Sequence, residues 1–461
     1  MLKNFAQQQG GNLEKVMRAL PRARLFLLLA LTGSAALIAV AVAIVNPGVT
    51  RYVESEAFRR ELDKQTSKGL HFDGRFQAIR RTGFLTATTA GFAGEKGVKA
   101  IKTISTGRAD AKFNPWGIFL RRWQLDYIQI PSGRAEIQAY EPKPENKPPK
   151  PWYSIFLPDH VHLKKLVCDS ADVTWRLRGR QAGFFKTSLL ITPHGRDFEY
   201  RASGGTMKTG LAPDLALRQL HLLITKELLT LYDLELAPNR ESQGRIRVKG
   251  QAGLKPDKSL SVTMNFSGIP VDPWIPEAWA SLFRGVASGD VLWEGQDMTL
   301  ETSSGHGAFR IEGGRVSGAP FLDQAAALTG KKSIEEIKLS RFSLEFEWKY
   351  PRAEIRQVEI EAEGAFFIKG TVLIENQNLG GSVQFGATPK FLEWLPRAEE
   401  VFAQQRDGYL WTTVNLAGTV QKPKEDLSPR VAELLKKSPG AAIGIFFRQM
   451  GEWFEKNLGG K

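Results

Sequence analysis

Apolar and polar residues alternate strictly in several short segments of the chain. Residues 260–266 read LSVTMNF and residues 342–348 read FSLEFEW, and the same period of two recurs in residues 358–362, 366–374 and 410–416. Successive side chains of a strand point to opposite faces, so this period predicts antiparallel strands with one apolar and one polar face. The chain is therefore expected to be mostly β.

Short polar breaks separate these segments. Glu375-Asn376-Gln377-Asn378 and Glu312-Gly313-Gly314 are predicted to be hairpin turns, because Asn and Gly accept the backbone angles of tight turns. A strand, a glycine and a second strand recur, for example over residues 245–268, 291–302 and 366–386. This weak repeat predicts hairpins stacked into one elongated antiparallel sheet.

Helices are expected in only four stretches of the body: residues 50–68, 321–328, 391–405 and 429–458. Ser428 is expected to cap the last stretch, with Pro429 in the first helical position, and a second proline at 439 breaks it. The part after this break has apolar residues at helical spacing on one face, which predicts a short amphipathic C-terminal helix. Its apolar residues are Ile443, Phe446, Phe447, Met450 and Phe454.

Residues 25–45, LFLLLALTGSAALIAVAVAIV, contain no charged side chain. At about 1.5 Å per residue a helix of this length spans roughly 30 Å, the thickness of the hydrocarbon core of a bilayer. Ala41-Val42-Ala43 resembles a signal-peptide cleavage site, but the apolar run exceeds the usual h-region of about 7–15 residues. One retained transmembrane helix is therefore expected.

The tail at residues 1–24 is short and basic, whereas the segment after the apolar run mixes Arg with Glu. The positive-inside rule then predicts a single-pass protein with a cytoplasmic N-terminus. The remaining chain is expected to divide into a β module at 46–140, a Pro-rich loop at 141–151, a β body at 152–427 and C-terminal helices at 428–461.

The formal net charge of +14 is spread along the chain. Arg245, Arg247 and Lys249 alternate with apolar residues, which predicts the solvated outer face of a strand, with weak attraction to anionic lipid headgroups as the alternative. The tryptophans do not lie in a basic stripe, so nucleic-acid binding is not expected. Cys168 is the single cysteine, which excludes an intrachain disulfide and predicts a small buried residue.

No catalytic signature is present in the sequence. Gly330-Lys331-Lys332-Ser333 lacks the earlier glycine of a phosphate-binding loop, and no Gly-x-Ser-x-Gly motif occurs. His160 and His162 share one face of a predicted strand but have no evident third ligand. A protein that is not an enzyme, with no metal and no cofactor, is therefore expected.

Several strand and glycine patterns recur along the chain. They are residues 245–250 (RIRVKG), 261–271 (SVTMNFSGIPV) and 285–291 (GVASGDV), followed by 368–370 (IKG), 380–383 (GGSV) and 415–420 (NLAGTV) with Pro423. Together with residues 109–116 (ADAKFNPW) and 125–130 (LDYIQI) after the apolar run, these patterns resemble the AsmA-like family of bacterial envelope proteins. The resemblance covers most of the chain after residue 25.

The resemblance implies anchoring in the cell inner membrane and a periplasmic sheet curled into an apolar groove. It also implies a role in lipid transport, by sheltering or transferring phospholipid acyl chains, or in outer-membrane biogenesis. This chain is short for a member that bridges two membranes, which leaves a partial conduit or an adaptor.

The strand pattern itself leaves two arrangements open. Few helices are expected, so the apolar face of the sheet either closes as a β-sandwich or forms a groove for lipid tails. The groove candidates are Val262, Met264, Phe266, Phe309, Ile311, Leu344, Phe346, Trp348, Ile368 and Val372. The alternative to lipid handling is a structural adaptor with an envelope protein partner, and an envelope enzyme ranks last.

Overall fold

The computed structural model describes residues 46–98, 100–114, 123–138, 161–177, 179–195, 197–210, 212–225, 227–254, 259–274, 283–296, 301–317, 336–419 and 423–436. The predicted membrane segment at 25–45, the helix at 321–328, the Pro-rich loop and the amphipathic stretch from Ile443 to Phe454 lie outside these residues. Within the described residues, no helix is both long and apolar enough to cross a membrane.

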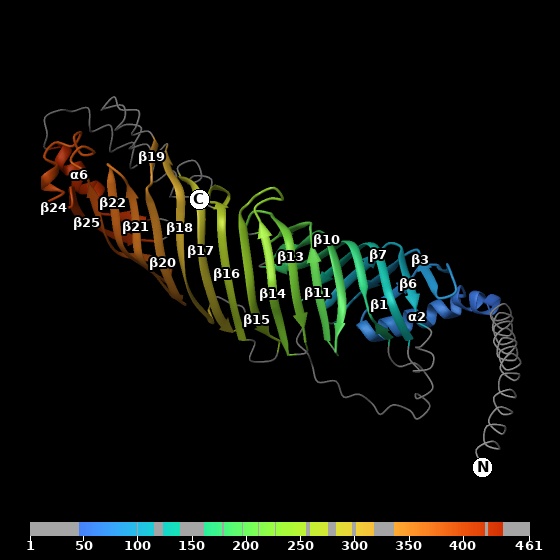
Figure 1. Cartoon of the computed structure of the whole chain (residues 1–461). Coiled ribbons are helices and arrows are strands. Elements are labelled where there is room, and N and C mark those ends of the chain that lie inside the picture. The colour runs from blue at the N-terminus through green and yellow to red at the C-terminus, as the bar shows by residue number, and fades with distance from the viewer. Residues whose placement is uncertain are drawn as a thin grey trace, which may run out of the picture. The chain divides into compact units, whose positions relative to one another are not determined.

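The chain is mostly β, and its described strands belong to one large sheet (Figure 1). It divides into two compact units: unit 1 comprises Met1–Pro131 and Ala139–His162, and unit 2 comprises Ser132–Gln138 and Leu163–Lys461. The division falls within strand β7 (Trp123–Ile137), ahead of the Pro-rich loop that composition suggests as a boundary.

Unit 1 contains a helix and several short strands. They are α2 (Glu56–Leu70), β1 (Asp73–Phe76), β2 (Ile79–Arg81), β3 (Thr86–Thr89), β4 (Phe92–Glu95), β5 (Ile101–Thr106), β6 (Ala109–Phe113) and the first part of β7. The helix predicted at 50–68 is confirmed but interrupted. Residues 46–53 form one helical segment, and α2 begins after Ser55, whose hydroxyl accepts a hydrogen bond from the Phe58 N–H at 3.2 Å.

Helix α2 covers the free edge of β1, which pairs with β4 on its other side. The Asp63 carboxylate accepts a hydrogen bond from the Phe76 N–H at 2.7 Å, and the Ser67 hydroxyl accepts one from the Gly74 N–H at 2.9 Å. These side chains satisfy backbone donors that would otherwise be open to another strand. The rings of Phe76 and Phe92, 4.5 Å apart, pack beside them.

Unit 2 is built almost entirely of strands, and it holds only short helices among its described residues. Strand β8 (Val161–Leu163) crosses from unit 1 into unit 2 at Leu163. The following strands are β9 (Leu166–Leu177), β10 (Arg180–His194), β11 (Asp197–Ser203), β12 (Thr206–Lys208), β13 (Leu215–Ile224), β14 (Leu228–Ala237), β15 (Arg245–Gly253), β16 (Ser259–Pro270), β17 (Phe283–Gln296), β18 (Ser303–Ser317), β19 (Glu336–Lys338), β20 (Arg341–Lys349), β21 (Arg352–Ala362), β22 (Phe366–Glu375), β23 (Asn378–Ala387), β24 (Gln404–Arg406), β25 (Tyr409–Gly418) and β26 (Pro423–Glu425). The helices are η2 (Asp272–Trp274), η4 (Ala398–Glu400) and α6 (Leu427–Lys436).

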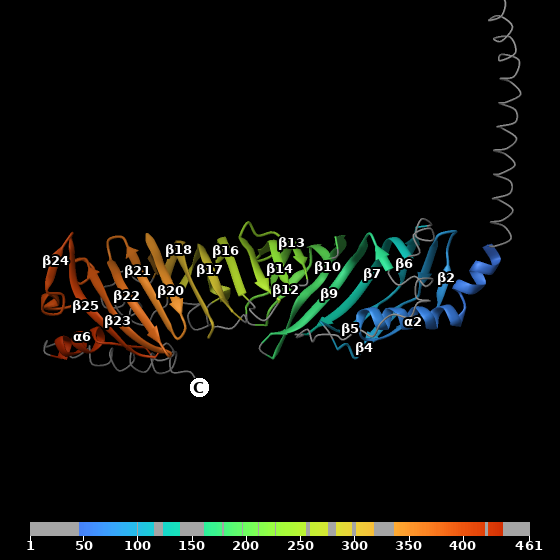
Figure 2. The same cartoon turned by 90° about the horizontal axis from the view of Figure 1, so that it is seen from below.

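Most strands of unit 2 pair antiparallel with the next strand along the chain, from β9 to β26. Short strands β12, β19 and β24 pair beside the long ones. Figure 2 shows these strands following one another side by side. The alternating segments predicted from the sequence lie in β16, β20, β21, β22 and β25, so the prediction of antiparallel strands in one sheet is confirmed.

One of the two predicted turns is confirmed. Glu375 pairs with Asn378 across a two-residue loop, and both loop residues, Asn376 and Gln377, have positive φ, as a type I′ hairpin requires. The turn predicted at residues 312–314 is wrong. Strand β18 continues through Gly313, and the register shift between β17 and β18 shows a β-bulge there, which glycine permits through its positive φ of 60°.

Two helix predictions need correction. Residues 391–403 form turns and the single 3-10 turn η4, and residues 404–405 begin strand β24, because prolines at 389 and 396 interrupt an α-helix and Arg397 is left-handed. The apolar residues of this segment are buried in a cluster with Ala387 and residues of α6, and they do not lie on one face of a helix. The last helix among the described residues, α6, begins at Leu427, so Ser428 lies inside it and Pro429 in its first turn; the predicted continuation to residue 458 lies outside the described residues.

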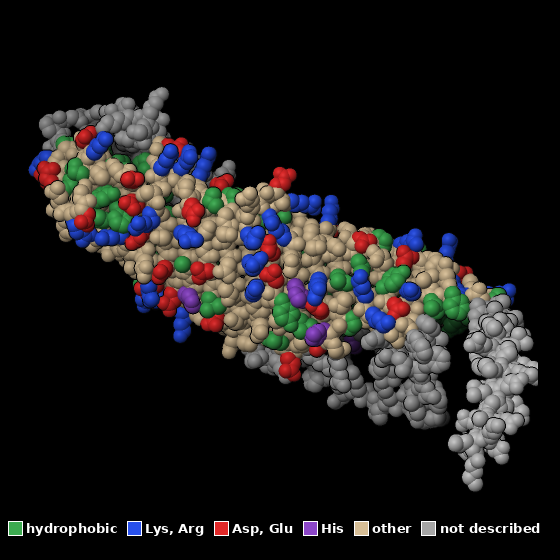
Figure 3. Space-filling model, viewed as in Figure 1, with side chains coloured by type: hydrophobic (Ala, Val, Ile, Leu, Met, Phe, Trp, Pro, Cys, Tyr) green, Lys and Arg blue, Asp and Glu red, His purple; other side chains and the backbone are tan. Residues whose placement is uncertain are grey.

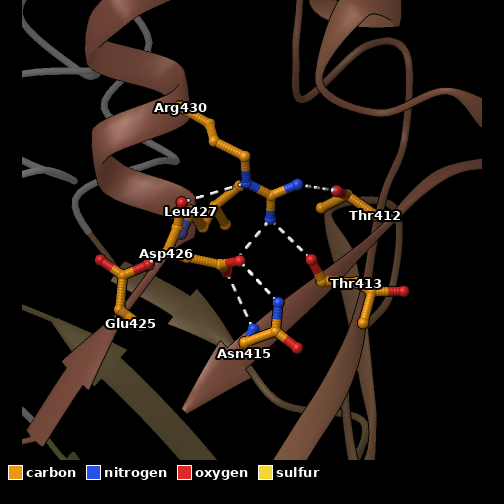
Figure 4. Close-up of polar contacts among 7 residues, drawn as sticks. All are labelled: Thr412, Thr413, Asn415, Glu425, Asp426, Leu427 and Arg430. Carbon is orange, nitrogen blue, oxygen red and sulfur yellow. Dashed lines mark hydrogen bonds and ion pairs between the residues drawn. The ribbon is translucent and has the colours of Figure 1, made fainter. Parts of the chain in front are cut away.

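At the C-terminal edge of the sheet, side chains replace a neighbouring strand along part of β25 (Figure 4). Asp426 accepts hydrogen bonds from the Asn415 N–H at 2.8 Å and its side-chain amide at 2.7 Å, and Arg430 donates to the Thr413 carbonyl at 2.6 Å. Burial raises the pKa of Asp426, but the bonds from Asn415 and the charge of Arg430 outweigh it and leave that pKa below its usual value. These contacts block strand addition at this edge.

Candidate functional site

The predicted groove residues lie on one face of the sheet in unit 2. Residues directly opposite each other on paired strands project to the same face. One row of such partners contains Val248, Met264, Val291, Gly307, Phe346, Ile355 and Val372. Three of the predicted residues, Met264, Phe346 and Val372, therefore share a face that extends from β15 to β22.

Two neighbouring rows include most of the other candidates. One contains Leu236, Ile246, Phe266, Gly289, Phe309 and Leu344, and the other contains Val262, Trp293, Gly305, Trp348, Ala353 and Ile374. Ile311 pairs with Ala287, two residues along from these rows, and Ile368 pairs with Ile360. We call this surface the apolar face, and it holds all the predicted groove residues.

The apolar face is covered unevenly. Ile311 is 6% exposed, whereas the other predicted groove residues are half-buried. Their chain neighbours on the opposite face of β16, such as Thr263 and Asn265, are exposed. The described strands all belong to one sheet, so none of them forms a separate second layer over these residues.

A buried cluster lies along the apolar face from β11 to β18. Leu217, Leu234, Leu236 and Ile246 belong to it. Of the predicted candidates, Ile311 also belongs to this cluster, and Met264, Phe266 and Phe309 pack against it. Val262 and the candidates on β20 and β22 lie outside the cluster. The face therefore has a closed part and a more accessible part.

Aromatic rings lie across glycines on the accessible part. A Cβ atom added at Gly305 would lie 2.2 Å from the Trp348 ring, and one added at Gly307 would lie 2.7 Å from the Phe346 ring. The Phe346 and Trp348 rings stack with centroids 6.0 Å apart. The sequence analysis missed these glycines. A signal was present, because two glycines two residues apart pair with two aromatic residues that are also two residues apart.

Two polar atoms are buried on this face. The indole nitrogens of Trp293 and Trp348 have no hydrogen-bond partner within the described structure. Leaving such a donor unpaired costs about 1–3 kcal/mol. These two residues lie in the same row, each opposite Gly305. An acceptor oxygen brought to this row by a ligand would relieve that cost.

The apolar face is covered at its C-terminal end. Residues of the 388–402 segment and of α6 form a buried cluster there with Ala387, and Leu392, Phe402 and Leu434 are all below 5% exposed. The Phe385 ring, on the partner residue of Ile368, lies 6.0 Å from the Phe402 ring. This cluster ends the accessible part of the face near β23.

The opposite face is polar and charge-balanced. Arg247 donates to Glu235 at 2.9 Å, which lowers the pKa of that carboxyl, and Arg356 donates to Glu354 at 2.9 Å. Arg247 and Glu345 also line a concavity of about 570 Å³. Figure 3 shows Lys and Arg interleaved with Asp and Glu, so the view presents no broad field of one sign. The predicted outward position of Arg247 on this polar face is confirmed.

Among the described residues, we consider the titratable groups of both faces as candidate catalytic groups. His221 Nε2 lies 2.5 Å from Glu199 Oε1, and hydrogen bonds from Arg201 and His221 lower the pKa of Glu199. Cys168 is buried, as expected, and burial raises the pKa of its thiol. In the described part of the chain, no group of three or more His, Cys, Asp or Glu side chains could hold a metal ion.

No protein-family model matches the chain, and neither a curated protein nor a solved structure is detectably similar to it. The AsmA-like resemblance therefore rests on the strand and glycine patterns of the sequence, and it stays a prediction.

Proposed function

We propose that this chain is a membrane-anchored protein of the bacterial cell envelope that shelters or transfers phospholipid acyl chains along its apolar face. The observation that carries the proposal is the continuity of that face. Half-buried apolar side chains such as Met264, Phe346 and Val372 follow one another across paired strands from β15 to β22. Contiguous exposed apolar surface in a soluble body marks a binding surface.

The dimensions of the face suit an acyl chain. Neighbouring strands lie about 4.8 Å apart, so the seven long strands from β15 to β22 extend over about 29 Å. The hydrocarbon core of a bilayer is about 30 Å thick and holds two layers of acyl chains, so a face of about 29 Å is long enough to cover a single acyl chain. Burial contributes about 0.8 kcal/mol per methylene, so such a face holds a chain without specific polar contacts.

The proposed location follows from the sequence. The apolar segment at 25–45 would hold the protein in the inner membrane, with the N-terminus in the cytoplasm and the body in the periplasm. In this proposal the sheet curls around its apolar face to form a groove. In this proposal the protein acts as a partial conduit, or as an adaptor that works with an envelope protein partner.

A second candidate is a structural adaptor whose sheet closes on itself and binds no lipid. The buried cluster of Leu217, Leu234, Leu236 and Ile246 favours it, because this part of the face is already covered. In that case Met264 and Phe346 would belong to a closed core.

Lipid bound to the full-length protein separates the two candidates. We expect phospholipid to co-purify with the chain in mild detergent, measured by mass spectrometry of extracted lipids. Val372→Glu, on the accessible part of the apolar face, should release the lipid. Thr371→Glu is the matched control, because it adds the same charge to the neighbouring, exposed position of β22.

The folding of these variants adds a second criterion. Burying an unpaired carboxylate in a closed core costs several kcal/mol, so a closed sandwich predicts that Val372→Glu misfolds. The lipid-handling proposal predicts a folded variant that has lost its lipid. Wild-type protein that carries no phospholipid and transfers none between liposomes would overturn the proposal.

A further inference from the structure

The part of unit 1 that follows the predicted membrane segment carries exposed apolar and aromatic side chains. Phe84 is 61% exposed, Tyr52 57% and Val49 39%. Val49 and Tyr52 lie in the helical segment at residues 46–53, and Phe84 lies in the loop between β2 and β3. Phe84 lies more than 30 positions after Val49 and Tyr52 in the chain, yet one arginine connects the two segments.

Arg81 makes that connection. Its guanidinium donates hydrogen bonds to the Thr50 hydroxyl at 2.9 Å, to the Asn46 carbonyl at 3.1 Å and to the Phe84 carbonyl at 2.9 Å. The guanidinium carbon also lies 5.6 Å from the centre of the Phe84 ring. The Arg81 N–H donates to Glu54 at 3.0 Å, which fixes the loop to the same segment a second time. Phe84 is therefore held beside residues 46–50.

The position of this cluster identifies what it faces. The uncharged run at 25–45 ends directly before Asn46, so a helix through the bilayer would emerge where Arg81 binds. The exposed Arg51 adjoins Tyr52 in the sequence, and the exposed Arg80 lies four residues before Phe84, with Glu54 as the acidic neighbour. Aromatic rings with flanking arginines suit the boundary between lipid headgroups and acyl chains.

We infer that Phe84, held by Arg81 beside residues 46–50, docks unit 1 onto the surface of the bilayer that anchors it. The inference rests on the membrane anchoring in the proposed function and adds a second contact with the lipid. A single helix leaves the body free to tilt, whereas an inserted loop fixes which side of unit 1 faces the membrane. Val49 would then lie in the headgroup layer.

An environment-sensitive fluorophore at residue 84 tests the inference in the full-length protein. Phe84→Cys is labelled with NBD and reconstituted into vesicles of phosphatidylcholine with phosphatidylglycerol. The native thiol of Cys168 is buried, and unsubstituted protein gives the labelling background. We expect the emission to shift to shorter wavelength and to be quenched by lipids that carry a spin label on the upper acyl chain.

Val98→Cys is the matched control. Val98 is 69% exposed, and its N–H donates to the carbonyl of His71, which follows the C-terminal end of α2. A helix of 15 residues is about 22 Å long, so this site is far from the end of α2 that adjoins residues 46–53. A label there should keep the emission of an aqueous probe.

The outcomes separate the inference from the anchoring beneath it. Protein that fails to float with the vesicles overturns the anchoring and the docking together. Protein that floats while the label at residue 84 emits like the label at residue 98 overturns the docking alone. Labelled Phe84→Cys combined with Arg81→Ala should float normally and lose most of the quenching, because the loop is released.

Discussion

Replacing Gly307 by alanine perturbs the accessible part of the apolar face at its centre. The new Cβ atom would lie 2.7 Å from the Phe346 ring and 2.3 Å from the Asp290 carbonyl oxygen. The ring can rotate away, but the carbonyl oxygen belongs to the backbone of the paired strand β17 and cannot move without distorting the ladder. Overpacking of this kind costs about 1–3 kcal/mol.

Gly380→Ala is the control for this prediction. Gly380 lies in β23 with no atom within 4 Å of the added Cβ, and its φ is not in the left-handed region. A glycine-to-alanine change at a compatible site stabilises a protein by about 0.4–1 kcal/mol through the unfolded chain. The two variants should therefore differ by about 1.5–4 kcal/mol in free energy of unfolding.

Urea unfolding followed by tryptophan fluorescence measures this difference in the purified full-length protein. Adding Phe346→Leu to Gly307→Ala should recover part of the loss, because only the contact with the ring is relieved. A coupling energy of about 0.5–3 kcal/mol between the two positions is expected for residues in contact. Equal stability of Gly307→Ala and Gly380→Ala would refute the placement of Phe346 over Gly307.

Three further predictions concern the sheet edge and the indole groups. Arg430→Ala should lower the free energy of unfolding by only about 1 kcal/mol, because the Arg430 side chain is 37% exposed and solvent weakens its interactions. The same variant should self-associate more in size-exclusion chromatography, since the Thr413 carbonyl becomes open to another strand. The pKa of Asp426 is lowered on folding, so the ionised carboxylate should contribute its full stabilisation of the folded state above about pH 4 and lose it as the pH falls further. The free energies of unfolding of wild type and Asp426→Asn should therefore approach each other below about pH 4. Trp348→Phe replaces the indole by a smaller aromatic ring and removes the unpaired N–H. In lipid-free protein the gain of about 1 kcal/mol from removing that donor should offset the lost packing and leave stability nearly unchanged, while retention of ester-linked phospholipid should weaken.

Strand periodicity predicts this fold well because the two faces of the sheet differ so clearly in polarity. The alternation over residues 260–266 and 342–348 places Met264 and Phe346 on the same face, and the pairing through Val291 and Gly307 bears this out. The Asn376-Gln377 turn was predictable for a similar reason, since local chemistry alone determines it.

Other features depend on contacts that periodicity does not contain. Residues 391–405 have apolar residues that suit a helix, but the prolines and the packing of Leu392 and Phe402 onto the end of the sheet produce turns instead. The bulge at Gly313 resembles a turn in sequence, because both use positive φ. The Asp426 and Arg430 contacts could not be predicted, since they require knowing which strand is last.

Photo-crosslinking in growing cells tests the central claim most directly. Benzoylphenylalanine replaces Phe346 on the apolar face in one full-length variant, and Glu347, on the exposed polar face, in the other. The lipid-handling account predicts a phospholipid adduct at position 346 and none at position 347. An adduct at neither position, with position 346 instead crosslinked to another part of the same chain, would contradict it.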